Sequence, residues 1–136
     1  MSNPLVYPMA SHVALTAVLY ALLTVARAPS VWSVGRRPDG SNPWANVEPR
    51  ISANLSNQFE WPLFFHVACL LLIELHAAGR IQLWLAWVFV AGRLAHSYVQ
   101  VFMPNIRLRG VVFTINFAAV LALWLLLLAA SPGQGV

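Results

Sequence analysis

The chain has 136 residues, of which 60% are hydrophobic and only 9% are charged. A soluble domain carries about 25% charged residues, so this composition excludes an ordinary soluble domain and indicates a membrane protein. The formal net charge is +4, and the eight basic residues are all arginines scattered near segment ends, which argues against nucleic-acid binding. The single cysteine, Cys69, excludes an internal disulfide and is expected to be a buried structural thiol.

The first apolar segment predicts a helix over residues 9–28, which is long enough to cross a membrane. The preceding residues lack the basic start of a secretory signal, so we expect this helix to be retained. Arg27 at its end is interpreted as an interfacial anchor or as a ligand contact supplied to a neighbouring subunit. Residues 29–49 hold four prolines, which a continuous helix does not tolerate, so they predict the one long loop, at the membrane surface.

The second predicted helix covers residues 50–78 and is polar in its first turns. Arg50, Asn54 and Asn57 share one helical face, and Glu60 follows one turn after Asn57. Pro62 lies inside the predicted helix and is expected to produce a kink beside this polar face. Glu60 is interpreted as a counter-charge for an arginine of the bundle, either Arg50 or Arg93.

The third and fourth predicted helices cover residues 81–103 and 107–131. Arg93, His96 and Gln100 fall on one face of the third helix. A charged side chain facing the bilayer core costs roughly 2.5 to 3.5 kcal/mol even on insertion scales, so this face is expected to turn inward. Together the segments predict an all-α integral membrane protein, a four-helix bundle in a single domain over residues 1–136.

Four spans would place both chain ends on the same side of the membrane. The two loops on the opposite side, with the adjoining helix ends, hold most of the arginines, so the positive-inside rule predicts cytoplasmic loops and non-cytoplasmic ends. The polar ends of the last three helices then converge on one pocket with apolar walls. The ligand implied is small and anionic, gripped by arginines, and the alternative is a polar network that only fixes helix register. The residues that converge are Arg50, Asn57, Glu60, Arg93, His96, Gln100 and Arg109.

The order of these motifs resembles the MAPEG family, the membrane-associated proteins in eicosanoid and glutathione metabolism, and its short bacterial members in particular. The motifs are NQFEWPLFF at 57–65, GRLAHSYVQ at 92–100 and IRLRGVVF at 106–113. The resemblance covers nearly the whole chain. It implies a homotrimer in a bacterial inner membrane that binds glutathione between neighbouring subunits, with a lipophilic electrophile or hydroperoxide as second substrate.

Carried over by position, the resemblance implies roles for individual residues. Arg109 would stabilise the glutathione thiolate and is the candidate catalytic residue. The residues that would contact or organise glutathione are Arg50, Asn57, Glu60, Arg93 and His96. No metal-ligand spacing is present, so we expect no metal.

The sequence departs from catalytic members at two positions. Such members commonly have a tyrosine four residues beyond the Arg109 position and another four beyond the His96 position, and here these residues are Phe113 and Gln100. Three hypotheses stay open: a glutathione-dependent transferase or peroxidase, a non-catalytic member that binds lipid or acts as a scaffold, and a small transporter in which Glu60, Arg93 and His96 form a relay.

Overall fold

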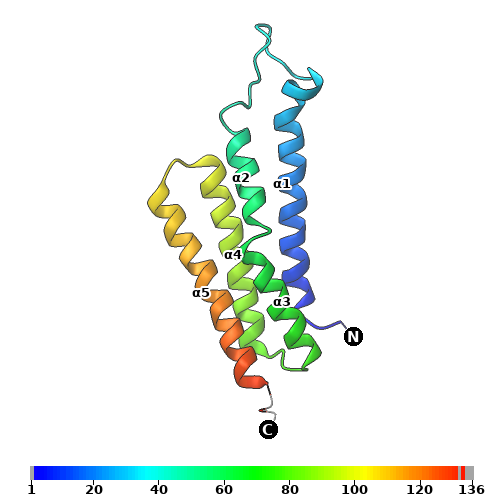
Figure 1. Ribbon diagram of the computed structural model, residues 1–136, viewed down its shortest axis with the longest axis vertical. Helices are drawn as coiled ribbons and strands as arrows, with labels where there is room; N and C mark the ends of the chain where they lie inside the picture. The colour runs from blue at the N-terminus through cyan, green and yellow to red at the C-terminus, as the bar shows by residue number, and fades with distance from the viewer. Residues whose placement is uncertain (1, 132, 134–136) are drawn as a thin grey trace.

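The protein is an all-α bundle in the computed structural model, which describes residues 2–131 and 133. Its five helices are α1 (Val6–Trp32), α2 (Glu48–Asn57), α3 (Trp61–Glu74), α4 (Arg80–Phe102) and α5 (Ile106–Ala130). Helices α2 and α3 follow one another along the bundle and form one interrupted rod beside α1 and α4 (Figure 1). The predicted four-helix arrangement is therefore confirmed, with its second member broken. The rest of the predicted domain, residues 1, 132 and 134–136, lies outside the described residues.

The break between α2 and α3 replaces the kink that the sequence predicted inside a helix over residues 50–78. Helix α2 ends at Asn57, and Glu60 has a non-helical backbone with φ −91° and ψ −104°. Pro62 lies in the first turn of α3, where its missing N–H would have had no helical partner anyway. Proline therefore begins a new helix here instead of bending an existing one.

Helix α1 is longer than the predicted 9–28, because it continues through Pro29 to Trp32. Proline is tolerated near the end of a helix when the carbonyl groups left free there find other donors. Two side chains of the following loop do this: Arg36 Nε donates to the Pro29 carbonyl at 2.7 Å and Asn42 Nδ2 to the Ala26 carbonyl at 2.9 Å. The loop is therefore fastened to the end of α1.

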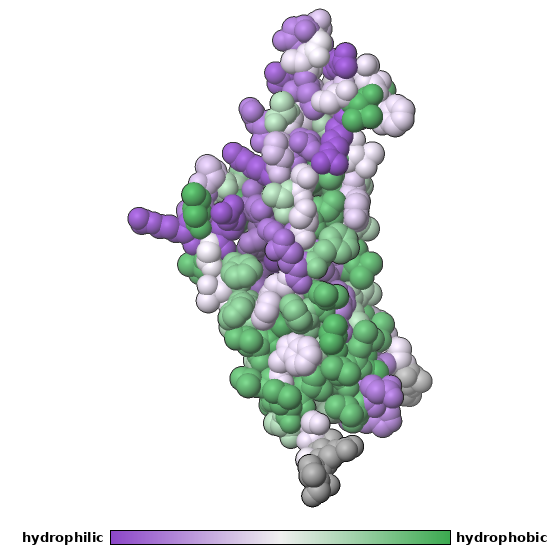
Figure 2. Space-filling model, in the orientation of Figure 1, coloured by the Kyte–Doolittle hydropathy of each residue, from purple (hydrophilic) through white to green (hydrophobic). Residues whose placement is uncertain are grey.

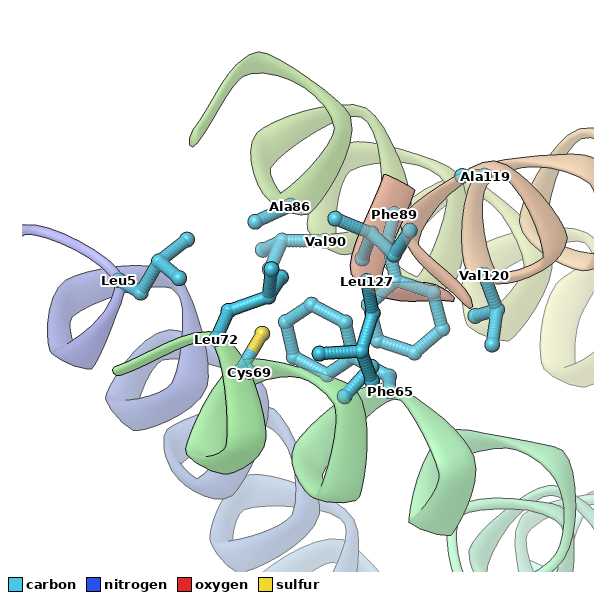
Figure 3. Close-up of a cluster of buried hydrophobic side chains, with 12 residues drawn as sticks. Leu5, Phe65, Cys69, Leu72, Ala86, Phe89, Val90, Ala119, Val120 and Leu127 are labelled. Atoms are coloured by element: carbon cyan, nitrogen blue, oxygen red, sulfur yellow. The ribbon is translucent and has the colours of Figure 1, made fainter. Parts of the chain in front are cut away.

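The main hydrophobic core joins the lower halves of α3, α4 and α5 (Figure 3). At its centre the rings of Phe65 and Phe89 are stacked, with centroids 4.0 Å apart. Cys69 is fully buried in the same cluster, so the expected structural thiol is confirmed. Close packing of this kind holds helices together in lipid, where the hydrophobic effect gives no driving force between them.

The surface of the bundle is divided into an apolar body and a polar end. Helices α1 and α5 are long and apolar enough to cross a membrane. Hydrophobic residues cover the lower body in the view of Figure 2, and hydrophilic residues gather toward the upper end, over the loop after α1 and near the turn between α4 and α5. The chain is a membrane protein whose polar end carries the residues considered next.

Candidate functional site

Two adjoining pockets lie at the polar end, between α2, the end of α4 and the start of α5. The first has a volume of about 400 Å³ and is lined by Ala53, Asn57, His96, Gln100, Ile106, Arg109, Gly110 and Phe113. The second, of about 390 Å³, is lined by Pro49, Arg50, Ala53, Gln100, Met103, Pro104, Asn105, Ile106 and Arg109. Four of the lining residues are common to both, so the two pockets form one continuous cleft. Five of the residues predicted from sequence to converge line this cleft, namely Arg50, Asn57, His96, Gln100 and Arg109.

The charge of the cleft is positive. Among the residues that the structure describes, Arg50 and Arg109 are its only charged lining residues, and no carboxylate lines either pocket. Arginine presents a planar fork of N–H donors that matches a carboxylate in a two-point interaction. The cleft is therefore suited to an anion that carries carboxylates, and Asn57 and Gln100 add uncharged polar groups beside the two arginines.

Arg93 lies behind this cleft and does not line it. Its side chain is buried, with 1% of its surface exposed, and its Nε donates to Gln58 Oε1 at 3.2 Å. Gln58 lies in the break between α2 and α3, directly after the last residue of α2. A buried guanidinium needs hydrogen-bond acceptors, and the Gln58 side chain supplies one.

Gln58 is the centre of a buried polar network that joins four helices. Its Oε1 also accepts from His12 Nε2 of α1 at 2.9 Å, so the neutral His12 ring has Nδ1 free to accept from His66 Nε2 of α3 at 2.9 Å. On its other side Gln58 Nε2 donates to the backbone carbonyl and Oδ1 of Asn54 at 3.1 and 3.2 Å, and to Ser97 Oγ at 3.4 Å. His66, which lies alone on an apolar helix, is thus hydrogen-bonded inside the bundle.

The network reaches the cleft through Gln100. Its Oε1 accepts from Asn54 Nδ2 at 2.8 Å and from Asn57 Nδ2 at 3.2 Å. Asn54 is fully buried whereas Asn57 and Gln100 face the first pocket. The polar face of α2 and the polar face of α4 therefore meet, and the orientation of two lining residues is fixed from behind.

Glu60 makes no salt bridge with either of its expected partners, Arg50 and Arg93. It is exposed, it lines neither pocket, and the one ion pair within the described residues joins Arg27 and Glu48 at 2.7 Å. Its carboxylate still interacts electrostatically with the buried Arg93 guanidinium, as the expected counter-charge would. A relay of Glu60, Arg93 and His96 would need a hydrogen bond between Glu60 and Arg93. In the described part of the chain no such bond is present, and Arg93 Nε donates to Gln58.

The comparison with protein families agrees with the motifs that line this cleft. The model of the MAPEG family matches residues 5–129. This chain belongs to the MAPEG family. No curated protein and no solved structure matched it in the corresponding comparisons. Membership confirms the resemblance seen in the motifs, and it supports a membrane function related to glutathione, transferase-like or peroxidase-like, in general terms.

Phe113 occupies the wall of the MAPEG cleft one helical turn after Arg109. Its ring centroid is 6.2 Å from that of His96, whose Nδ1 is buried without a partner among the described residues. A phenylalanine offers no O–H at this position, so the side-chain donors that line this pocket are those of Asn57, His96, Gln100 and Arg109. Tyr98 does not line the pocket and is 60% exposed, so it does not replace the missing hydroxyl.

Sequence reasoning missed three members of the network, namely His12, Asn54 and Gln58, as parts of the site. Helical spacing alone placed Asn54 on the polar face of its helix, together with Arg50 and Asn57. No spacing or motif in the sequence connects Gln58 or His12 to that face. Gln58 follows the last residue of α2 with a helical backbone, and its contact with Arg93 of α4 is a tertiary contact that spacing within one helix does not predict. Two lone histidines on separate apolar helices, His12 and His66, were a weak hint that they pair across the bundle.

Proposed function

We propose that this MAPEG protein is a glutathione-dependent transferase or peroxidase that acts on lipophilic electrophiles or hydroperoxides. The observation that carries the proposal is the continuous cleft, in which Arg50 and Arg109 are the only charged lining residues among those the structure describes. Its uncharged polar lining residues are Asn57, His96, Gln100 and Asn105. Glutathione is a small anion with two carboxylates and a thiol, which is the chemistry that such a cleft would bind.

The two arginines of the cleft contact different groups of glutathione in this proposal. Arg50, at the outer pocket, pairs with a carboxylate of glutathione, while Arg109 borders both pockets and lies near the thiol. A guanidinium beside a thiol favours the thiolate, which is the nucleophile. His96 and Asn57 orient the peptide part of the ligand, Arg93 keeps the wall behind them in place, and Glu60 on its exposed turn makes a contact only with the ligand or a neighbouring subunit.

The proposal includes a homotrimer with four membrane spans in each chain. Glutathione would lie between neighbouring subunits, and the second substrate would enter from the bilayer. Both chain ends would lie on the non-cytoplasmic side of a bacterial inner membrane, because the arginine-rich loops are expected to face the cytoplasm. The cleft then faces the cytoplasmic glutathione pool, with its apolar wall continuing into the membrane.

The test is calorimetric titration of glutathione into the purified protein in detergent, with the ultraviolet difference absorbance of the thiolate and the native mass measured on the same sample. Arg109→Ala is expected to weaken binding about tenfold or more, as the loss of a charge-assisted hydrogen bond does. Arg107→Ala is the matched control, since Arg107 is an exposed arginine of the same helical turn that lines neither pocket. Equal affinity in both variants and in the unchanged protein would remove Arg109 from the site.

Phe113 favours a second candidate function. A member without the tyrosine hydroxyl stabilises the thiolate less, and the protein would then bind glutathione or a lipid without catalysing a reaction. Glutathione binding without a thiolate signal would support this candidate. No binding at millimolar glutathione would overturn the enzyme proposal and leave a lipid-binding or scaffold role.

A further inference from the structure

A small pocket lies at the end of the bundle opposite the cleft. It lies between the residues that precede α1 and the turn that joins α3 to α4, which are close together at the lower end in Figure 1. We call it the end pocket. Its volume is about 260 Å³, and its lining includes Asn3, Leu5, Ala78, Arg80 and Leu83. It shares no lining residue with the cleft, so it is a separate candidate site.

The end pocket combines an apolar wall with one positive charge. Leu5 has only 1% of its surface exposed and belongs to the main hydrophobic core, against which Ala78 and Leu83 pack. Arg80 is exposed, and it is the only charged lining residue among those the structure describes. The pocket is therefore suited to an anion that is joined to an apolar group.

The polar side chains of the end pocket are hydrogen-bond donors. Arg80 takes part in no ion pair and no side-chain hydrogen bond in the part of the chain that the structure describes. Asn3 Oδ1 accepts from the Leu5 N–H at 3.1 Å, which fixes the orientation of the amide and leaves Asn3 Nδ2 as a donor. A guanidinium beside an amide donor matches a phosphate group, whose oxygens accept several hydrogen bonds and pair with arginine in a two-point contact.

The end pocket lies at the level of lipid headgroups. Helix α4 begins at Arg80, and Ile81 and Trp84 on its first turns are 63% and 73% exposed. Tryptophan is enriched where a membrane protein crosses from hydrocarbon to water. The other arginines lie at the polar end of the bundle, apart from the buried Arg93. Arg80 is thus separate from the arginine-rich end and lies where phosphate groups of the bilayer are found.

We propose that the end pocket binds the headgroup of an anionic phospholipid of the phosphatidylglycerol type. Basic pockets beside membrane helices bind lipid headgroups in this way. Arg80 and Asn3 hold the phosphate, and the acyl chains lie along the exposed side chains of Ile81 and Trp84. Among the described residues no carboxylate lines the pocket, so the ammonium of a zwitterionic headgroup finds no partner there.

The size of the end pocket agrees with a headgroup whose chains remain outside. Its volume of about 260 Å³ is below the roughly 300 to 1,000 Å³ of pockets that enclose a whole small molecule. The proposal goes beyond the proposed function, because the end pocket shares no residue with the cleft and needs no glutathione.

The experiment is a lipid titration of the purified full-length protein in a neutral detergent, read by native mass spectrometry. Phosphatidylglycerol and phosphatidylcholine with the same acyl chains are added at equal concentration, and phosphatidylglycerol is expected to bind about tenfold more tightly. Arg80→Gln should weaken phosphatidylglycerol binding about tenfold, the size expected for the loss of a charge-assisted hydrogen bond. Arg107→Gln is the matched control, since Arg107 is an exposed arginine in the first turn of α5 that lines neither the end pocket nor the cleft.

Asn3→Asp gives a second, independent readout. It keeps the Oδ1 that accepts from Leu5 and replaces the Nδ2 donor with a negative charge, so it should weaken phosphatidylglycerol binding and leave the unfolding temperature unchanged. Equal affinity for the two lipids would overturn the proposal, and so would unchanged phosphatidylglycerol binding in Arg80→Gln. Displacement of the lipid by an equal concentration of glycerol phosphate would overturn the lipid assignment in favour of a soluble phosphate ester. A changed number of subunits in the native mass of Arg80→Gln would also contradict it, because the pocket would then be a subunit contact.

Discussion

Restoring a hydroxyl at position 113 is the most direct test of how this cleft would treat a thiol. Phe113→Tyr adds one O–H donor at the tip of a ring that already lines the first pocket, one turn after Arg109. Phe113 is 42% exposed and is not part of the main hydrophobic core. The substitution therefore adds a donor without the strain of overpacking.

The expected magnitude follows from the strength of a hydrogen bond to a charged group, about 1.5 to 3 kcal/mol. We take the lower value, because the pocket is open on one side and water competes there. One pKa unit corresponds to about 1.4 kcal/mol, so the pKa of the bound glutathione thiol should fall by about one unit. The pKa of the thiol falls because the hydroxyl donates to the thiolate and so favours the charged form.

The assay is a pH titration of thiolate difference absorbance at saturating glutathione, for the unchanged protein and for Phe113→Tyr. Phe117→Tyr is the control, since it adds the same hydroxyl one turn further along α5, outside the lining of either pocket. The apparent pKa should fall in Phe113→Tyr alone, with a matching gain in the rate of any conjugation at neutral pH. Identical titration curves for all three proteins, at full glutathione occupancy, would refute the placement of the thiol beside this ring.

Three further outcomes are expected. Gly92→Ala should destabilise the bundle by about 1 to 3 kcal/mol in thermal unfolding, because its Cβ would overlap Asn116 Oδ1 of α5. Gly110→Ala, whose Cβ would have nothing within 4 Å, should not destabilise it, and equal unfolding temperatures of the two variants would contradict this. Gln58→Leu should lower the free energy of unfolding by about 3 kcal/mol or more, because the buried Arg93 guanidinium loses its acceptor. Gln58→Glu keeps an acceptor oxygen and should lower the free energy of unfolding less. A larger loss of stability in Gln58→Glu would show that the acceptor does not determine the stability. The Ser41 hydroxyl and N–H donate to the Asp39 carboxylate and hold its pKa below the usual range. These bonds therefore stabilise the turn above the ordinary carboxyl pKa, and the stabilisation is lost as pH falls through the lowered pKa. In an NMR titration Ser41→Ala should raise the Asp39 pKa, and an unchanged pKa would contradict the assignment.

The bounds of the last two helices, α4 and α5, were predicted to within one residue at each end. Residues 81–103 and 107–131 were expected, and α4 and α5 span Arg80–Phe102 and Ile106–Ala130. The signals there are unambiguous, because Gly79 and Pro104 bound long apolar runs and Asn105 caps α5 by accepting from the Leu108 N–H at 3.0 Å. Prolines were harder to interpret. Pro62 is compatible with a kink and with a first turn, and the choice depends on tertiary contacts that a sequence pattern does not contain.

The site was likewise predicted in part. Helical spacing was enough to bring His96, Gln100 and Asn57 to one region, since residues on one polar face must turn away from lipid together. It did not identify the partner of Arg93. A charge-pair rule suggested Glu60, whereas the acceptor for Arg93 Nε is an uncharged amide, Gln58, and Arg93 Nη2 has no hydrogen-bond partner in the described part of the chain. A rule that pairs opposite charges does not consider amides.

The enclosure of Cys69 has a practical consequence for experiments on this protein. Its side chain has no exposed surface, and the chain has no other cysteine. In the folded state the protein therefore contributes no accessible sulfhydryl, and any modification by an alkylating reagent records an opening of the core between α3, α4 and α5. The unaltered sequence thus contains a built-in reporter of unfolding, and it allows a single engineered cysteine to be labelled anywhere on the surface without first removing a native one.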